Sequence, residues 1–271
     1  MAKSLLATLE ARLVQTFTYG GSSVVDDGST DATAALLKEY EGIPGFKVIT
    51  QRNRGLAGAR NTGIAAARGL YIGFCDADDL WVPEKLANHV PHLESAPHIG
   101  VSYSGSALID DDGASLCIAH NPSLKNITAA HIFKRNPIGN GSAPVIRKAV
   151  FDAIAYRPTS EQTRDWYFDE TFRQSEDIEC WLRIALTTGW QFQGIKGNLT
   201  KYRINAGGLS AATDLQLAAW ERMVAKLSPI APEFFARTTK TARAYQLRYL
   251  ARRAISDKNT GSAVDFLTQS L

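Results

Sequence analysis

The sequence predicts an α/β fold in which a mostly parallel sheet is flanked by helices and followed by a helical C-terminal extension. Three observations lead to this prediction. Strand and helix patterns alternate three times within the first 95 residues, as expected for parallel strands joined by crossover helices. Two acidic clusters directly follow predicted strands, where the carboxyl ends of a parallel sheet form ligand sites. From residue 211 onward, apolar residues recur at helical spacing.

The first 95 residues contain three predicted strands and four predicted helices. Ser29 or Thr30 is expected to cap the second helix, and Pro83 to start the fourth. The strands are expected at 22–26, 46–50 and 70–75, and the helices at 2–15, 29–40, 56–68 and 83–93.

The remainder of the chain has a different pattern. Strands at 100–108 and 114–119 flank an Asp-rich turn and are expected to form a hairpin. Helical periodicity then continues from 211 to the end, with a break at Ser228-Pro229. Between these parts we expect a strand at 144–147, a polar loop at 156–171, a helix at 176–187 and a strand at 191–205.

Size, charge and cysteine content exclude several classes of protein. The chain has 271 residues, 45% of them apolar, which suits one large domain or one domain with a helical appendage. A net charge of +3, without a basic run, argues against a nucleic-acid-binding protein. Cys75, Cys117 and Cys180 form no CxxC pair and are expected to be free thiols in a reducing compartment. The first residues resemble an amphipathic helix and not a signal peptide, so we expect a cytoplasmic protein.

The two acidic clusters are the first candidate site residues. Asp26 and Asp27 end the first strand, where a carboxylate can accept a hydrogen bond from a nucleotide base; helix capping is the alternative. Asp76, Asp78 and Asp79 follow the third strand. Acids two residues apart, such as Asp76 and Asp78, can converge on one hard divalent cation and leave positions for diphosphate oxygens. An acidic surface turn is the alternative for this second cluster.

A Gly- and Ala-rich segment at 53–63 lies between these clusters. Its small residues permit close packing of a helix on the sheet. Arg60 or Arg54 could reach a phosphate, and a buried ion pair is an equally good interpretation of Arg60.

Three motifs together resemble the family 2 glycosyltransferases, which are inverting enzymes of the GT-A fold. The sequence VVDDGSTD is followed by NRGLAGARNTG and then by a hydrophobic strand that leads into DADDLWVPEKL. Any one motif is weak, but three in this order and spacing over residues 24–86 are specific. The resemblance implies that Asp27 reads the base and Asp76 contacts the ribose. It also implies that Asp78, with Asp76, holds Mn²⁺ or Mg²⁺ against the diphosphate of a donor in which the nucleotide is UDP.

The resemblance continues in the second half of the chain. The segment SEDIECWLR is similar to the family's "ED" segment, which implies that Asp177 is the general base. Trp181 could stack on a sugar ring, and a core tryptophan is the alternative. The segment YRINAGGLS is similar to the family's closing segment but has Asn205 where a His is frequent.

The sequence departs from the family most clearly at its start. Family members open with a strand and a loop before the first helix, whereas the helix at 2–15 here begins next to Met1. We therefore expect the usual first strand, with its nucleotide-contacting loop, to be absent from the sheet. A chain shortened at its N-terminus and a gap filled by another segment are the two explanations.

These features predict an inverting transferase that uses a nucleotide-diphosphate sugar and a glycan or lipid-linked acceptor, as in bacterial cell-surface polysaccharide synthesis. Residues 1–210 would form the GT-A domain, with a nucleotide-binding part at 1–95 and an acceptor part at 96–210. Residues 211–271 would form the extension, whose basic helices could contact the inner face of the membrane. Helices that simply cap the catalytic domain are the alternative, and the more frequent one. The alternative is a catalytically impaired remnant that serves as a binding or assembly module. A nucleotidyltransferase would need a Gly-rich phosphate loop near the N-terminus, and none is seen.

Overall fold

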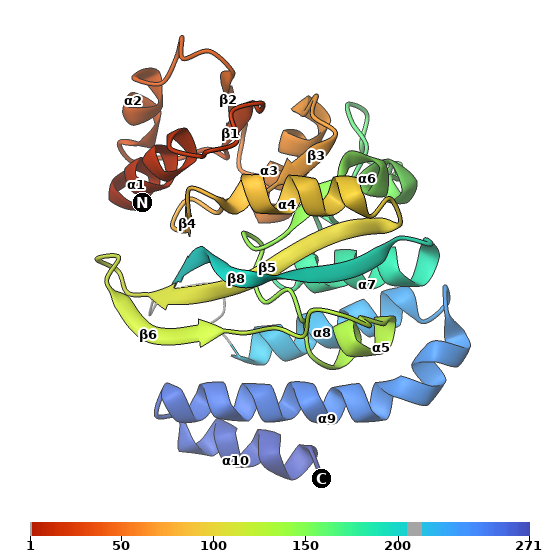
Figure 1. The fold of residues 1–271 in the computed structure, drawn as a ribbon. Helices are drawn as coiled ribbons and strands as arrows, with labels where there is room; N and C mark the ends of the chain where they lie inside the picture. The colour runs from red at the N-terminus through yellow and green to blue at the C-terminus, as the bar shows by residue number, and fades with distance from the viewer. Residues whose placement is uncertain (1, 205–212) are drawn as a thin grey trace.

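The structure is a computed structural model that describes residues 2–204 and 213–271 of the chain. Figure 1 shows a small N-terminal unit, a larger central sheet with helices on both sides, and the C-terminal helices beneath it.

The N-terminal unit is a two-stranded parallel sheet covered by two helices. It consists of α1 (Ala2–Leu13), β1 (Ser22–Asp26), α2 (Thr33–Lys38) and β2 (Phe46–Thr50). The strands pair in register, with Val24 opposite Val48. Both strands have the predicted bounds. The helix α2 begins later than expected, because Asp31 accepts a hydrogen bond from the Thr33 backbone N–H and holds the preceding residues in a turn.

The central sheet has six strands in the order β3-β7-β5-β8-β4, with β6 paired to the other part of β5. Only the β5–β8 pair is parallel; the β3–β7, β5–β7, β4–β8 and β5–β6 pairs are antiparallel. The expectation of a mostly parallel sheet is therefore wrong for this sheet, because a hairpin and reversed connections supply its strands after residue 95. The strands are β3 (Tyr71–Gly73), β4 (Leu80–Trp81), β5 (Ile99–Ile109), β6 (Ser115–His120), β7 (Val145–Arg147) and β8 (Gln191–Arg203).

The strands form two separate sheets, with no strand between β1 and β3 among the described residues, which agrees with the expected absence of the family's usual first strand. Among the strands that the structure describes, β1 pairs only with β2, and β3 pairs only with β7. Their remaining edges line a cavity of about 2680 Å³ together with α3 (Gly55–Ala66). The helix α3 links the two sheets, since Gly63 lies beside Val25 of β1 while Ile64 belongs to the same core cluster as Ile72 of β3.

The main hydrophobic core extends from the central sheet into the C-terminal helices. Phe133 stacks on Trp220 with a centroid separation of 5.3 Å and meets Phe235 edge to face. The extension is helical, as predicted, and its side chains share one core with the sheet. The remaining helices are α4 (Lys85–Ser95), α5 (Ala129–Lys134), α6 (Lys148–Ile154), α7 (Glu176–Thr187), α8 (Thr213–Leu227), α9 (Pro232–Ser256) and α10 (Thr260–Gln269).

Candidate active site

A cluster of carboxylates around one buried arginine lies where β3, α3 and α7 meet. Arg60 on α3 donates to Asp76 Oδ1 at 3.0 Å and to Glu176 Oε1 at 2.9 Å. Asp177 follows Glu176 in the first turn of α7, and all four residues line the large cavity. We call Arg60, Asp76, Glu176 and Asp177 the acid–arginine centre. It joins the second acidic cluster to the ED segment, and Arg60 is the buried ion-pair residue that ties them together.

The electrostatics of this centre depend on burial and on the Arg60 charge. Burial raises the pKa of Asp177 above its usual value, and the positive charge of Arg60 opposes that rise. Burial also raises the pKa of Glu176, again against the effect of Arg60. Burial alone would lower the pKa of Arg60, but the surrounding carboxylates more than offset it, so the guanidinium stays charged. A carboxylate with a raised pKa is a better proton acceptor, which suits Asp177 for general-base chemistry.

Asp78 and Asp79 occupy different environments although they are adjacent. Asp79 is fully buried, and its Oδ1 accepts the backbone N–H of Arg203 at 3.0 Å. Burial first, and then the charge of Asp76, raises the pKa of Asp79 to about 8. Asp78 lines the cavity, and its backbone carbonyl accepts from the Arg203 side chain. Asp79 is therefore a structural carboxyl group, whereas Asp76 and Asp78 face the cavity.

The cavity-facing acids have the chemistry of a partial metal site. Within residues 2–204 and 213–271, no three His, Cys, Asp or Glu side chains are grouped as a complete ligand set. Two carboxylates, however, suffice for Mg²⁺ or Mn²⁺ when water and substrate phosphates supply the other oxygens. Asp76 and Asp78 fit that requirement, since both reach the cavity at the end of β3. Asp76 would have to share its carboxylate between the cation and Arg60.

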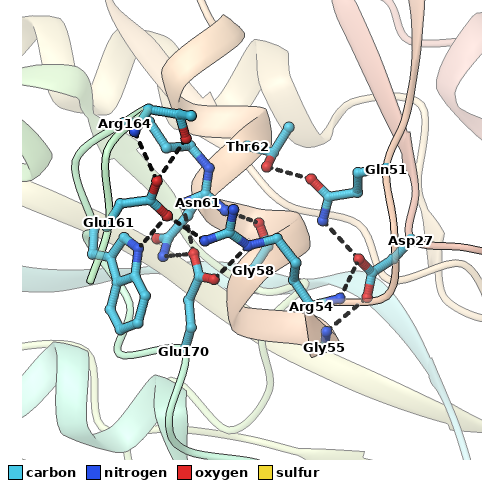
Figure 2. Close-up of polar contacts among 12 residues, drawn as sticks. Asp27, Gln51, Arg54, Gly55, Gly58, Asn61, Thr62, Glu161, Arg164 and Glu170 are labelled. Atoms are coloured by element: carbon cyan, nitrogen blue, oxygen red, sulfur yellow. Dashed lines mark hydrogen bonds and ion pairs between the residues drawn. The ribbon is translucent and has the colours of Figure 1, made fainter. Parts of the chain in front are cut away.

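Asp26 and Asp27 both line the cavity, but their carboxylates also hold local structure. Figure 2 shows Asp27 at the start of α3, where it accepts the backbone N–H groups of Arg54 and Gly55 at 2.8 Å each and the Gln51 amide at 2.6 Å. Asp26 is buried and accepts from the Ser29 backbone N–H. Neither acid caps the following helix α2, whose N-cap Ala32 has no side-chain cap hydrogen bond, so the capping alternative is not observed there. Base recognition by Asp27 stays a prediction.

A network of ion pairs missed by the sequence analysis ties the 156–171 loop to α3. Arg54 pairs with both Glu161 and Glu170 (Figure 2). Arg164 adds a second cation on Glu170 at 2.6 Å. Asn61, fully buried, accepts the backbone N–H groups of residues 167 and 168 and donates to Glu170. Arg54 therefore has a structural role beside the site. Its partners Glu161 and Glu170 lie more than 100 residues away in sequence, so no local sequence pattern indicates these pairs.

The expectation that Trp181 stacks on a sugar is wrong. Trp181 has no exposed surface and packs edge to face on Phe168, with ring centroids 5.7 Å apart. It belongs to the main core because α7 is covered along this face. Asn205, at the position of the family's frequent His, lies outside the described residues.

Arg203 and Glu176 are further site residues that the sequence analysis quoted within motifs without giving them a role. Arg203 donates to the backbone carbonyls of Asp78, Asp110 and Asp111, so it fixes the acidic loop against the β5–β6 turn. In the sequence, Arg203 and Glu176 could have been found only because each lies in a motif next to residues with an assigned role.

The split α/β sheet, with carboxylates at a strand end and at a helix start around one cavity, defines a GT-A-type transferase fold. The structure of Staphylococcus aureus TarS residues 1–349 in complex with UDP-GlcNAc is similar with a TM-score of 0.64 and 16% identity, covering 98% of this chain and 86% of that one. The mannosyltransferase PcManGT from Pyrobaculum calidifontis, in complex with GDP-Man and Mn²⁺, gives a TM-score of 0.64 at 18% identity over 99% and 71% of the two chains. At these identities the likeness concerns the fold alone.

Sequence comparison then gives the family. Residues 2–154 match the model of glycosyl transferase family 2, and the chain belongs to that family. It is 28% identical over 220 residues to the Escherichia coli UDP-Glc:alpha-D-GlcNAc-diphosphoundecaprenol beta-1,3-glucosyltransferase WfaP, covering 77% of this chain and 75% of that protein. The putative teichuronic acid biosynthesis glycosyltransferase TuaG of Bacillus subtilis is 28% identical over 207 residues, 75% of each chain. The chain is thus a glycosyltransferase whose relatives include enzymes of cell-surface polysaccharide synthesis.

Proposed function

We propose that this glycosyltransferase moves a sugar, with inversion, from a UDP-sugar to a glycan or lipid-linked acceptor during synthesis of a cell-surface polysaccharide. The acid–arginine centre carries the proposal, because it brings the proton acceptor Asp177 and the cation-binding Asp76 to one cavity, which Asp78 also lines. The names of WfaP and TuaG, and the UDP-GlcNAc bound to TarS, support this donor and acceptor class.

Asp177, Arg60 and the two cation-binding acids, Asp76 and Asp78, have distinct tasks in this reaction. Asp177 takes the proton of the acceptor hydroxyl as its oxygen forms a bond to the anomeric carbon. The bond between that carbon and the donor phosphate oxygen breaks, and its electron pair leaves with the nucleoside diphosphate. Mn²⁺ or Mg²⁺, when bound by Asp76 and Asp78, supplies positive charge for this leaving group. Arg60 holds Asp76 and Glu176 at fixed positions, so that the acids converge before substrate binds.

The nucleotide half of the site is proposed to include Asp26 and Asp27 at the end of β1. Both line the same cavity as Asp76, which supports a donor lying between the two sheets. Residues 1–95 would then form the nucleotide-binding part and 96–210 the acceptor part, with 211–271 as the helical extension. No helix among the described residues is long and apolar enough to cross a membrane. We propose that the chain works at the cytoplasmic side of the membrane, where the acceptor lipids would be met.

Replacing Asp177 by Asn tests the proposal directly. The variant should lose transfer by a factor on the order of 10²–10⁴, because the amide cannot accept the proton. Its affinity for UDP in the presence of Mn²⁺ should stay within twofold of the wild type, and EDTA should abolish binding in both proteins. Asp165→Asn, an exposed acid in the 156–171 loop, is the matched control. Loss of UDP binding in Asp177→Asn would assign Asp177 a structural role, and full transfer activity in EDTA would contradict the cation site.

A further inference from the structure

The wall of the cavity formed by α9 differs chemically from the wall that carries the catalytic acids. Tyr245, Arg248, Tyr249 and Arg252 line the cavity, and we call them the α9 strip. Their spacing of i, i+3, i+4 and i+7 places them on one face of the helix. The opposite face is buried against α8 and α10 through residues such as Leu247 and Leu250. A cationic and aromatic face is therefore held toward the cavity by a well-packed helix.

The side chains of the α9 strip are exposed and ready for a ligand. Tyr245 and Tyr249 are 44% and 42% exposed, so their ring faces are accessible. Arg60, by contrast, is held by the carboxylates of Asp76 and Glu176. Neither Arg248 nor Arg252 forms an ion pair with any residue that the structure describes.

The position of the strip relative to the acids identifies the substrate it would meet. Figure 1 places α9 below β6 and β8, while α3 lies above the central sheet, next to its edge strand β3. Tyr202, near the end of β8, lines the same cavity as the α9 strip and the cation-binding acids. In an inverting transfer the acceptor approaches the anomeric carbon from the side opposite the leaving group. The α9 strip lines the same cavity as the cation-binding acids but comes from a different element, which leaves it available to the acceptor.

The chemistry of the strip narrows the acceptor class. Guanidinium groups bind phosphate oxygens through paired N–H donors, and one turn of helix separates Arg248 from Arg252 closely enough for both to reach one diphosphate. Tyrosines beside them present apolar ring faces with a hydroxyl at the tip, which suits a lipid or sugar attached to that phosphate. Lys134 and Arg135, at the end of α5, line the same cavity and add positive charge beside α9.

We propose that the α9 strip binds the phosphate groups of an acceptor whose sugar is attached to a lipid diphosphate. This assignment rests on the proposed function and adds to it the chemical group that the acceptor must carry. The donor diphosphate, by contrast, is assigned to Asp76 and Asp78 through the cation.

The test uses geranyl diphosphate as the probe and blocks the donor site with saturating UDP and Mg²⁺. Calorimetry should show that wild-type protein binds geranyl diphosphate under these conditions and does not bind geraniol. The double variant Arg248→Ala/Arg252→Ala should bind the probe about tenfold or more weakly, since each guanidinium contributes charge-assisted hydrogen bonds. Its affinity for UDP should match the wild type, because the strip does not contact the donor.

The double variant Arg237→Ala/Lys240→Ala is the matched control. Both residues are exposed cations on α9 that do not line the cavity, so this variant loses the same net charge and should bind the probe as the wild type does. Equal weakening in both double variants, unchanged probe binding in Arg248→Ala/Arg252→Ala, or weaker UDP binding in that variant would each overturn the proposal. Failure of wild-type protein to bind UDP would contradict the proposed function separately, since probe binding can also be measured without UDP.

Discussion

At the scale of single residues, Lys85 is the most unusual charged group outside the acid–arginine centre. It is fully buried, its Nζ donates to the Ala143 carbonyl at 2.7 Å and to Thr200 Oγ1 at 3.0 Å, and it lies over the Trp81 ring. Burial lowers its pKa to about 7. Because Ala143 lies in the loop that also supplies Ser142 to the Asp76 backbone N–H, Lys85 supports the floor of the site.

The lowered pKa of Lys85 predicts a definite dependence of stability on pH. The unfolded chain holds this proton up to about pH 10.5, while the folded chain releases it near pH 7, so folding releases a proton between these values. The Lys85 contribution to the free energy of unfolding should therefore increase as pH rises from 7 to 10, by at most about 1.4 kcal/mol per pH unit. Urea unfolding of wild type and Lys85→Met at several pH values measures the difference in slope. Parallel curves for the two proteins would show that the lysine titrates normally.

At the scale of elements, the 156–171 loop is irregular in backbone but fixed by its polar side chains. Glu161 and Glu170 have side chains that are only 5% and 6% exposed, and Arg54 of the α3 start pairs with both. Hydrogen bonds from Thr163, then from Arg54 and Trp166, hold the pKa of Glu161 well below its usual value. The loop is thus a rigid wall next to the site, although no strand or helix within it provides the order.

Replacing Arg54 by Ala should detach this loop from α3. The free energy of unfolding should fall by about 2 kcal/mol, because two nearly buried carboxylates lose a cation while keeping their other partners. Limited proteolysis should then cut first between residues 156 and 171. Arg157→Ala is the control, since its pair with Asp165 is 49% and 42% exposed and should contribute less than about 0.5 kcal/mol. Similar losses in the two variants would show that burial of the network does not matter.

At the scale of the whole molecule, the C-terminal helices complete the core of the transferase. Trp220, Met223, Leu227 and Phe235 belong to the same cluster as the side chains of β5 and α7. By contrast, α10 packs on α9 through a separate cluster around Phe266. The boundary at residue 211 therefore separates two patterns of secondary structure within one continuous core.

A chain that ends at Ile204 should lose its cooperative unfolding transition, because Phe133 and its neighbours would be exposed to water. A chain that ends at Lys258 lacks only α10 and should keep a cooperative transition at a lower Tm. Thermal melts followed by circular dichroism distinguish these outcomes. A cooperative melt of the 1–204 chain at the wild-type Tm would make residues 211–271 an independent appendage.

The sequence predicts well the bounds of helices and strands, which depend on local periodicity. The bounds of β1, β2 and α7 agree with expectation because alternation, caps and breakers act within a few residues. Strand direction after residue 95 and the Arg60–Glu176 pair depend on contacts between distant segments, 116 residues apart in the second case. Trp181 shows the same limit, since periodicity cannot tell which side of an amphipathic helix is covered by core and which by a ligand.

The separate N-terminal sheet has a consequence for hydrogen exchange. It carries its own small apolar cluster around Leu5, Leu9 and Leu37, apart from the main core, so it can open without unfolding the rest. We therefore expect the N-terminal unit to have a lower free energy of local opening than the central sheet. A nucleotide held between Asp26 and Asp76 would contact both units, and its binding free energy would slow exchange in β1 and β2 more than in β5. Slower amide hydrogen exchange in β1 and β2 would then show that the donor is bound, even if the backbone fold does not change.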